Sequence, residues 1–151
     1  NKMGADRNYR YTKQELILRL FAFHDNLQGY GGRLSKFLNE YMRKHRNAKD
    51  DFLREKEELF NETVRIALTK IWSGYAPEKI NVSIFEATLV GVAFNLEFLR
   101  EASNDACRRR FESLISADAF STEKLREGLS GKPRVIERMT SAVNIFGPDG
   151  I

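Results

Sequence analysis

Three glycines within four residues, Gly29, Gly31 and Gly32, are the first feature of the chain that could do chemistry, because glycine-rich loops cradle phosphate groups. A Walker-type phosphate loop follows a strand and carries a Lys-Ser or Lys-Thr pair, and neither accompanies these glycines. The dinucleotide-binding fingerprint also requires a preceding strand. The segment instead follows a helical apolar pattern. It therefore predicts a bend between two helices, with the N–H groups of Gly31 and Gly32 as a minor anion-binding alternative.

Other candidates for catalysis are sparse. The chain has one cysteine, Cys107, and two histidines, His24 and His45, which are too few for a zinc site of Cys and His ligands. His24 and Asp25 are adjacent, and adjacent side chains on a helix point apart, so we do not expect a catalytic pair. We assign no catalytic, cofactor-binding or metal-ligating residue to this chain. A single cysteine also excludes an internal disulfide and fits a reducing cytoplasm, where we expect the protein to reside.

Basic side chains are concentrated in the first third of the chain. Residues 1–50 contain eleven Lys and Arg against five Asp and Glu, whereas residues 51–100 contain six against eight. Arg43, Lys44 and Arg46 are the best candidates for contact with nucleic acid. The simpler interpretation is that these cations complement the negative end of a helix dipole, and we favour it.

Two further groups of charges predict ion pairs. Glu15 and Arg19 are four residues apart, which favours a pair on one helix face, although Arg19 could instead contact a partner domain. Three consecutive arginines at 108–110 span most of a helical turn, so they cannot all face one phosphate backbone. We expect them to form a solvated face, with ion pairs to Asp105 or Glu112.

The elements that must position these residues are helical. Apolar residues recur at helical spacing, and no strand alternation is present. We expect the first three helices over residues 12–28, 33–45 and 51–73. A fourth should start at Asn81 or Ser83, with an apolar side that reaches Leu99. The others are expected over 104–116, in a short stretch after Ser121, and from Pro133 to Phe146. Capping boxes are expected at Thr12–Glu15 and Ser83–Glu86. Gly29 should stop the first helix in a left-handed conformation, and Gly74 should close the third before a loop at 76–79.

The sequence therefore predicts an all-α fold, a single domain of about five to seven helices over residues 1–151, with the first and third helices at its centre. The chain has 151 residues, of which 42% are hydrophobic, enough for one core. No apolar run approaches the roughly 18 residues of a membrane span. The chain starts on Asn1 and ends on a turn-like segment, so we expect it to be part of a longer multidomain protein, although processing would explain both ends equally well.

Two motifs add a family resemblance. The segment YTKQELILRLFAF (residues 11–23) contains an E-L-x-L-R-x-x-A pattern, and FLNEYM (residues 37–42) contains F-L-N-x-x-M. Asn81, Phe85 and Glu86 match a later helix start, and KPRVIERMTSAVNIF (residues 132–146) matches a last helix with Arg138 in place. Together these segments resemble the helical half of the N-terminal region of the GmrSD-type restriction family.

The resemblance implies a helical companion of a phage-defence enzyme rather than a catalytic chain. In that family a ParB- or sulfiredoxin-like half carries an Asp-Gly-Gln-Gln-Arg motif that supports nucleotide hydrolysis linked to DNA restriction, and a C-terminal nuclease portion carries a catalytic His. Neither part is present in this sequence. The implied partners are the ParB-like and nuclease domains of a parent protein that uses NTP, and Arg19 and Asn39 are the candidate interdomain contacts.

The alternative interpretation is an independent nucleic-acid-binding domain, or an enzyme, that uses the basic first third. DNA would then be the partner. Association with a second copy of the chain stays open under both interpretations, and neither requires a membrane.

Overall fold

The chain is all-α in the computed structural model, which describes the backbone of residues 2–73 and 80–150 and the side chains of residues 13–73 and 80–150. Within this part there is no strand, as predicted, and there are seven α-helices: α1 (Lys2–Asn26), α2 (Leu34–Lys44), α3 (Asp50–Ile66), α4 (Val82–Phe94), α5 (Leu96–Glu101), α6 (Asn104–Ile115) and α7 (Lys132–Phe146). Shorter helical turns are η1 (Leu27–Gly29), η2 (Ala67–Ile71) and η4 (Asp118–Phe120). Gly74 and residues 76–79, where a helix end and a loop were expected, lie outside the described residues.

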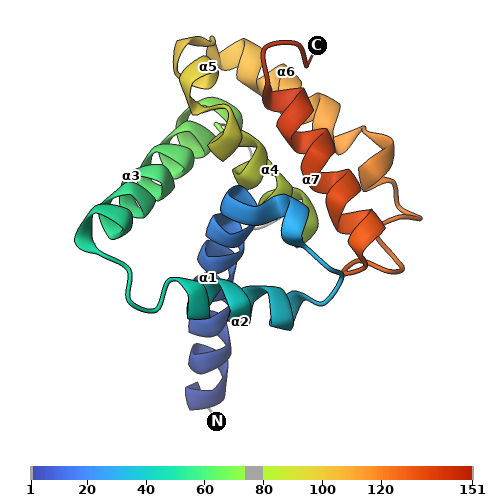
Figure 1. The fold of residues 1–151 in the computed structure, drawn as a ribbon. Coiled ribbons are helices and arrows are strands. Elements are labelled where there is room, and N and C mark those ends of the chain that lie inside the picture. Colours follow the sequence, from blue (N-terminus) through green and yellow to red (C-terminus); the bar gives the residue numbers. More distant parts are fainter. Residues whose placement is uncertain (1, 74–79, 151) are drawn as a thin grey trace.

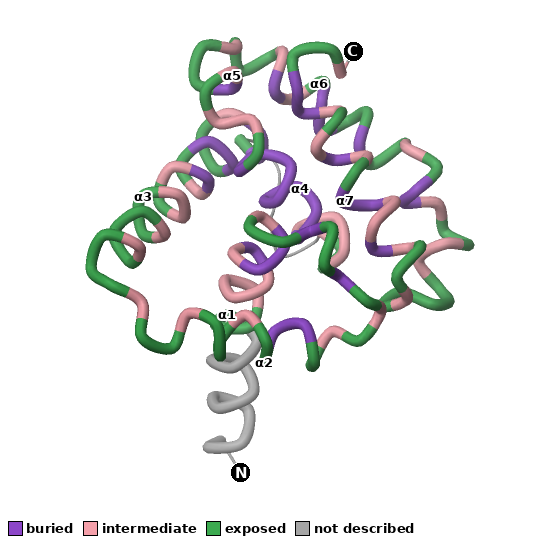
Figure 2. Tube along the Cα trace, in the orientation of Figure 1, coloured by how far each residue is buried: buried purple, intermediate pink, exposed green. Residues whose placement is uncertain are grey.

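Helix α4 forms the centre of the domain. It lies between α1 and α3 on one side and α7 on the other (Figure 1). Every residue from Glu86 to Ala93 is buried, whereas α3 buries only Thr63 and Ile66 (Figure 2). The expectation that the first and third helices form the centre is therefore wrong for α3, and only the end of the predicted range 51–73, where Ala67, Ile71 and Trp72 are buried, lies in the core. Its charged, amphipathic sequence suits a helix packed on one face, and the apolar α4 suits burial on all sides.

The connection between α1 and α2 is the bend that the glycines predict. Helix α1 ends at Asn26, η1 follows, and α2 starts at Leu34. The left-handed residue is Gly32, with φ of +97°, and not Gly29. Tyr30 is only 1% exposed within this bend, and its hydroxyl donates a hydrogen bond to the carbonyl of Ser130. The glycines therefore allow a reversal that buries a tyrosine.

Both predicted capping boxes are wrong. Helix α1 already begins at Lys2, so Thr12 lies inside it, and Glu15 pairs with Arg19 instead. At α4 the N-cap is Asn81, whose side chain accepts a hydrogen bond from the N–H of Ser83. Glu86 is thereby free to face α1.

The apolar stretch that begins at α4 is broken into two helices at Asn95. The side-chain amide of Asn95 donates to the carbonyls of Gly91, at 2.8 Å, and Val143, at 2.9 Å. It therefore ties the end of α4 to α7 and starts α5 in a new direction.

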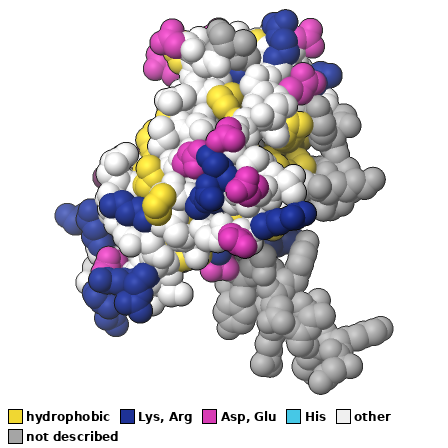
Figure 3. Space-filling view, turned by 90° about the vertical axis from the view of Figure 1, so that its right-hand side faces the viewer, with side chains coloured by type: hydrophobic (Ala, Val, Ile, Leu, Met, Phe, Trp, Pro, Cys, Tyr) yellow, Lys and Arg dark blue, Asp and Glu magenta, His cyan; other side chains and the backbone are white. Residues whose placement is uncertain are grey.

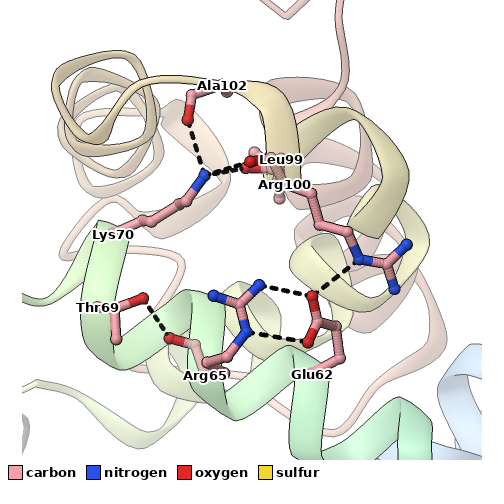
Figure 4. Close-up of polar contacts among 7 residues, drawn as sticks. All are labelled: Glu62, Arg65, Thr69, Lys70, Leu99, Arg100 and Ala102. Carbon is pink, nitrogen blue, oxygen red and sulfur yellow. Dashed lines mark hydrogen bonds and ion pairs between the residues drawn. The ribbon is translucent and has the colours of Figure 1, made fainter.

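Helix α5 is attached to α3 by polar contacts (Figure 4). The ammonium group of Lys70, on the π-helical turn η2, donates to the carbonyls of Leu99, Arg100 and Ala102 at 2.6–2.9 Å. Glu62 accepts from Arg100 at 2.8 Å and also pairs with Arg65. The Lys70 cation thus satisfies the carbonyl end of α5.

The last third of the chain covers the other side of α4. Helix α6 matches its predicted range, and Pro133 stands in the first turn of α7, as expected. The short helix is η4, which precedes Ser121 instead of following it. Val135, Met139 and Phe146 are buried, so α7 supplies the apolar face opposite α1.

Candidate functional site

The predicted nucleic-acid contacts lie together at one corner. Arg43 and Lys44 are in the last turn of α2, and Arg46 is in the connection to α3. All three side chains are exposed, and no ion pair joins them to another described residue. Arg43 and Lys44 border a shallow depression of about 410 Å³. The structure therefore brings these three cations together at the negative end of the α2 dipole. This placement fits contact with nucleic acid and also fits the simpler role of complementing the dipole.

Contacts between aromatic rings hold the turn between α2 and α3 in a defined conformation. His45 stacks on Phe52 with ring centroids 4.3 Å apart and an interplanar angle of 10°. The Tyr41 ring lies 4.5 Å from the ring of His45, and the Lys56 ammonium lies 5.3 Å from the Phe52 centroid. These contacts join α2 to α3, so the basic residues between them are carried by a defined turn.

Asp25 is the polar centre of the three N-terminal helices. Its carboxylate accepts hydrogen bonds from the Tyr41 hydroxyl on α2, at 2.6 Å, and from the Lys56 ammonium on α3. The Nδ1 atom of His24 lies 3.0 Å from the same carboxylate. The expectation that His24 and Asp25 point apart is therefore wrong: Asp25 is the last-but-one residue of α1, where the helix ends.

The electrostatics of Asp25 oppose a role in proton transfer. Burial alone would raise its pKa, but the hydrogen bonds from His24, Lys56 and Tyr41 outweigh burial and hold the pKa well below its ordinary value. Burial, together with the bond to Asp25, raises the pKa of Tyr41. Asp25 therefore stays a carboxylate and Tyr41 stays protonated at neutral pH. The group ties α1, α2 and α3 together.

The two predicted interdomain residues have different surroundings. Arg19 pairs with Glu15 at 3.4 Å, as its spacing predicts, and with Glu86 of α4 at 2.8 Å. Burial lowers the pKa of Arg19, but the hydrogen bonds and charges of Glu86 and Glu15 together outweigh this effect, so the pKa is raised. Asn39 is exposed on α2. Asn39 is thus open to a partner, whereas Arg19 also holds α1 to α4.

Two arginines that we did not select are buried. Arg138 on α7 is 4% exposed and donates through Nη2 to the Leu129 carbonyl at 2.7 Å. Arg110 on α6 is 7% exposed, contacts the Gly147 carbonyl and lies 4.8 Å from the Phe98 ring. The prediction of a solvated face is therefore wrong for Arg110, and no described ion pair joins the three arginines to Asp105 or Glu112. Neither burial had a clear signal in the sequence, because charged residues are buried only with specific partners and those partners come from other elements.

An apolar groove runs along α1, α3 and α4. It has a volume of about 320 Å³, and its walls are almost entirely apolar, with Leu16, Ile17, Phe60, Val64, Leu68 and Phe85 among the lining residues. Leu68 is 52% exposed there. The indole N–H of Trp72, another residue of the lining, is buried without a hydrogen-bond partner among the described residues. Such a groove is typical of a surface that another polypeptide covers.

Comparison of the chain with protein-family models, curated proteins and solved structures finds no match. Within the described residues there is no group of three or more His, Cys, Asp and Glu side chains placed to hold a metal ion. None of the described helices is both long and apolar enough to cross a membrane. The basic corner, the apolar groove and the buried arginines are therefore the features of the described residues that could bind a partner or a ligand.

Proposed function

We propose that this chain is a non-catalytic helical module of a GmrSD-like, nucleotide-dependent DNA restriction protein, and that it packs on a ParB-like, nucleotide-hydrolysing domain. The apolar groove along α1, α3 and α4 carries the proposal. The resemblance of residues 11–23 and 37–42 to that family supplies the identity of the partner.

The groove suits a protein partner because its walls are apolar. Covering them would stabilise a complex by roughly 25 cal/mol for each Å² removed from water. The Leu68 side chain is 52% exposed there and would be covered as well. An apolar segment of the partner would therefore fit.

The coding sequence that precedes Asn1 gives the first test, because the proposal requires a domain with an Asp-Gly-Gln-Gln-Arg motif there or in a neighbouring gene. That domain is produced separately and titrated with the chain by isothermal titration calorimetry. We expect Leu68→Glu to weaken the association by about tenfold or more, because it places a charge in an apolar interface.

Ile115→Glu is the matched control. Ile115 ends α6, is 41% exposed and does not line the groove. Both substitutions are at exposed positions and should leave the circular dichroism spectrum and melting temperature nearly unchanged. Equal binding by the two variants would remove the groove from the proposal, and no binding by the unmodified chain would remove the proposal itself.

DNA contact is a second candidate function, favoured by one observation. Arg43, Lys44 and Arg46 are exposed together on a fixed turn, and no described carboxylate neutralises them. This contact would be electrostatic and independent of sequence. It is compatible with the first proposal, since a module of a restriction protein works beside DNA.

A further inference from the structure

A small cavity lies where α1, the bend before α2, the start of α4 and the first half of α7 meet. Its volume is about 260 Å³, and its polar walls are Arg19, Tyr30, Ser83, Glu86, Ser130 and Arg138. Arg19 is the one predicted site residue in its lining, and the cavity shares no lining residue with the apolar groove. The cavity is therefore separate from the surfaces described above.

The cavity carries more positive charge than its own carboxylate neutralises. Among the described residues of the lining, Arg19 and Arg138 are cationic and Glu86 is the one acidic residue, which leaves a formal charge of +1. Glu86 is already bound to Arg19 at 2.8 Å and acts on Arg138 only through its charge. Burial lowers the pKa of Arg138, and the charge of Glu86 opposes this effect only in part.

Hydrogen-bond donors are in excess as well. The Nε and Nη1 atoms of Arg138 and the Nε atom of Arg19 are buried without a protein acceptor among the described residues. Arg138 is 96% buried, because its exposed fraction is 4%. A buried guanidinium group with unpaired donors is costly unless an anion completes it.

The start of α4 adds to the positive potential. Val82 and Ser83, the first two residues of this 13-residue helix, line the cavity. The N-terminal end of a helix carries a partial positive charge and favours anions. Two arginines and one helix terminus thus face the same space.

We propose that this cavity binds the oxyanion group of a small ligand, a phosphate or a carboxylate. Both anions are attracted by the cationic guanidinium groups. The unpaired nitrogens of Arg138 are themselves buried, so Arg138 acts on the ligand through its charge. The volume lies below the roughly 300–1,000 Å³ of sites for drug-sized ligands, so the bound part is the anionic group and little more.

The first experiment titrates inorganic phosphate into the chain at constant ionic strength, with sodium chloride as the exchanged salt. Binding is followed by calorimetry and by the melting temperature, which a ligand of the folded state raises. Arg138→Met removes the charge and retains most of the volume, and we expect it to weaken phosphate binding by about tenfold or more. Arg134→Met, one turn earlier on α7 and outside the lining, should bind like the unmodified chain.

A second variant changes binding in the opposite direction. Glu86→Gln raises the formal charge of the lining from +1 to +2, so we expect it to bind phosphate more tightly. Unfolding of the Arg138→Met variant could explain its weaker binding of phosphate, but it could not explain tighter binding by Glu86→Gln. A parallel titration with sodium acetate distinguishes the two anions, and binding of either one supports the site.

Three results would overturn the proposal: no binding of phosphate or acetate to the unmodified chain, equal binding by Arg138→Met and Arg134→Met, or weaker binding by a folded Glu86→Gln variant. None of these results depends on whether the apolar groove docks a partner domain, so the two proposals fail separately.

Discussion

Asp25, a charge near the surface, and Arg138, a buried charge, have opposite arrangements. Asp25 accepts from Tyr41 and Lys56 and contacts His24, so its oxygens are satisfied within the chain. Arg138 donates to one carbonyl and keeps two nitrogens without an acceptor among the described residues. A charge with all its partners holds structure, whereas one without them retains the capacity to bind. The difference assigns a structural role to Asp25 and a binding role to Arg138.

Asp25→Asn tests the structural role. It removes the anion that Lys56 and Tyr41 contact, and we expect it to lower the free energy of unfolding by about 1–3 kcal/mol at pH 7. Hydrogen bonds hold the folded-state pKa of Asp25 below the unfolded value of about 3.9. Its contribution is therefore present above about pH 4 and is lost as pH falls from there toward the folded-state pKa.

Urea denaturation of both proteins from pH 7 down to pH 3 measures this contribution. The difference between them should shrink below about pH 4. Asp149→Asn is the control, because Asp149 is exposed near the C-terminus. A difference that stays constant over this range would show that Asp25 is not held ionised by its partners.

At the residue scale, sequence reasoning found pairs that are local and missed those that are distant. Glu15–Arg19 follows from helical spacing and is present. Arg19–Glu86 joins residues 67 positions apart, and no periodicity can reveal it. Glu86 did give one signal, as the one charged residue within the apolar α4. Its partner could be known only once α1 and α4 were placed side by side.

At the element scale, helix bounds were predictable where local chemistry sets them. The predicted ranges 33–45 and 104–116 differ from α2 and α6 by one residue at some ends, and Pro133 marked the start of α7. The break at Asn95 was missed, because a contact with the Val143 carbonyl of α7 fixes it. Local chemistry did not fix every start, since α1 begins at Lys2 and not at residue 12, and the break at Asn95 is a tertiary event.

The close packing of α4 on α7 depends on Gly91. A Cβ atom at this position would lie 2.7 Å from the Ala142 carbonyl oxygen and 2.7 Å from a ring carbon of Phe146. We expect Gly91→Ala to lower the free energy of unfolding by about 1–3 kcal/mol, because two packed helices must move apart. Urea denaturation followed by circular dichroism measures the change.

Gly31→Ala is the control for this prediction. A Cβ atom at Gly31 would meet nothing within 4 Å, and its φ angle is not positive. This substitution should change the stability by no more than about 0.5 kcal/mol. If the two variants are equally stable, the contact between α4 and α7 adapts to the added methyl group, and Gly91 does not set their distance.

At the scale of the whole molecule, the surface charge is uneven. Lys and Arg side chains alternate with Asp and Glu over much of the face in Figure 3, and basic side chains gather at its lower left edge. From residue 33 to residue 49 there are six Lys and Arg and one acidic residue, Glu40. This excess was countable in the sequence. The placement of Arg43, Lys44 and Arg46 together on one turn required the packing of α2 against α3 through His45 and Phe52.

The last prediction concerns DNA binding at this turn. If Arg43, Lys44 and Arg46 contact phosphates, binding to a labelled duplex should be weak, independent of sequence and steeply dependent on salt, because Lys and Arg release counterions from DNA. Their combined change to Ala should reduce the slope of log K against log salt by about 2–3, since each phosphate that is no longer neutralised accounts for about 0.9 of the slope. Fluorescence anisotropy at several salt concentrations gives the slope.

The control changes Arg54, Arg109 and Arg126 to Ala, which removes the same charge from exposed positions elsewhere. Equal slopes for the two triple variants would mean that the turn only complements the dipole of α2. Tight binding that persists at high salt would instead indicate direct contacts with the bases.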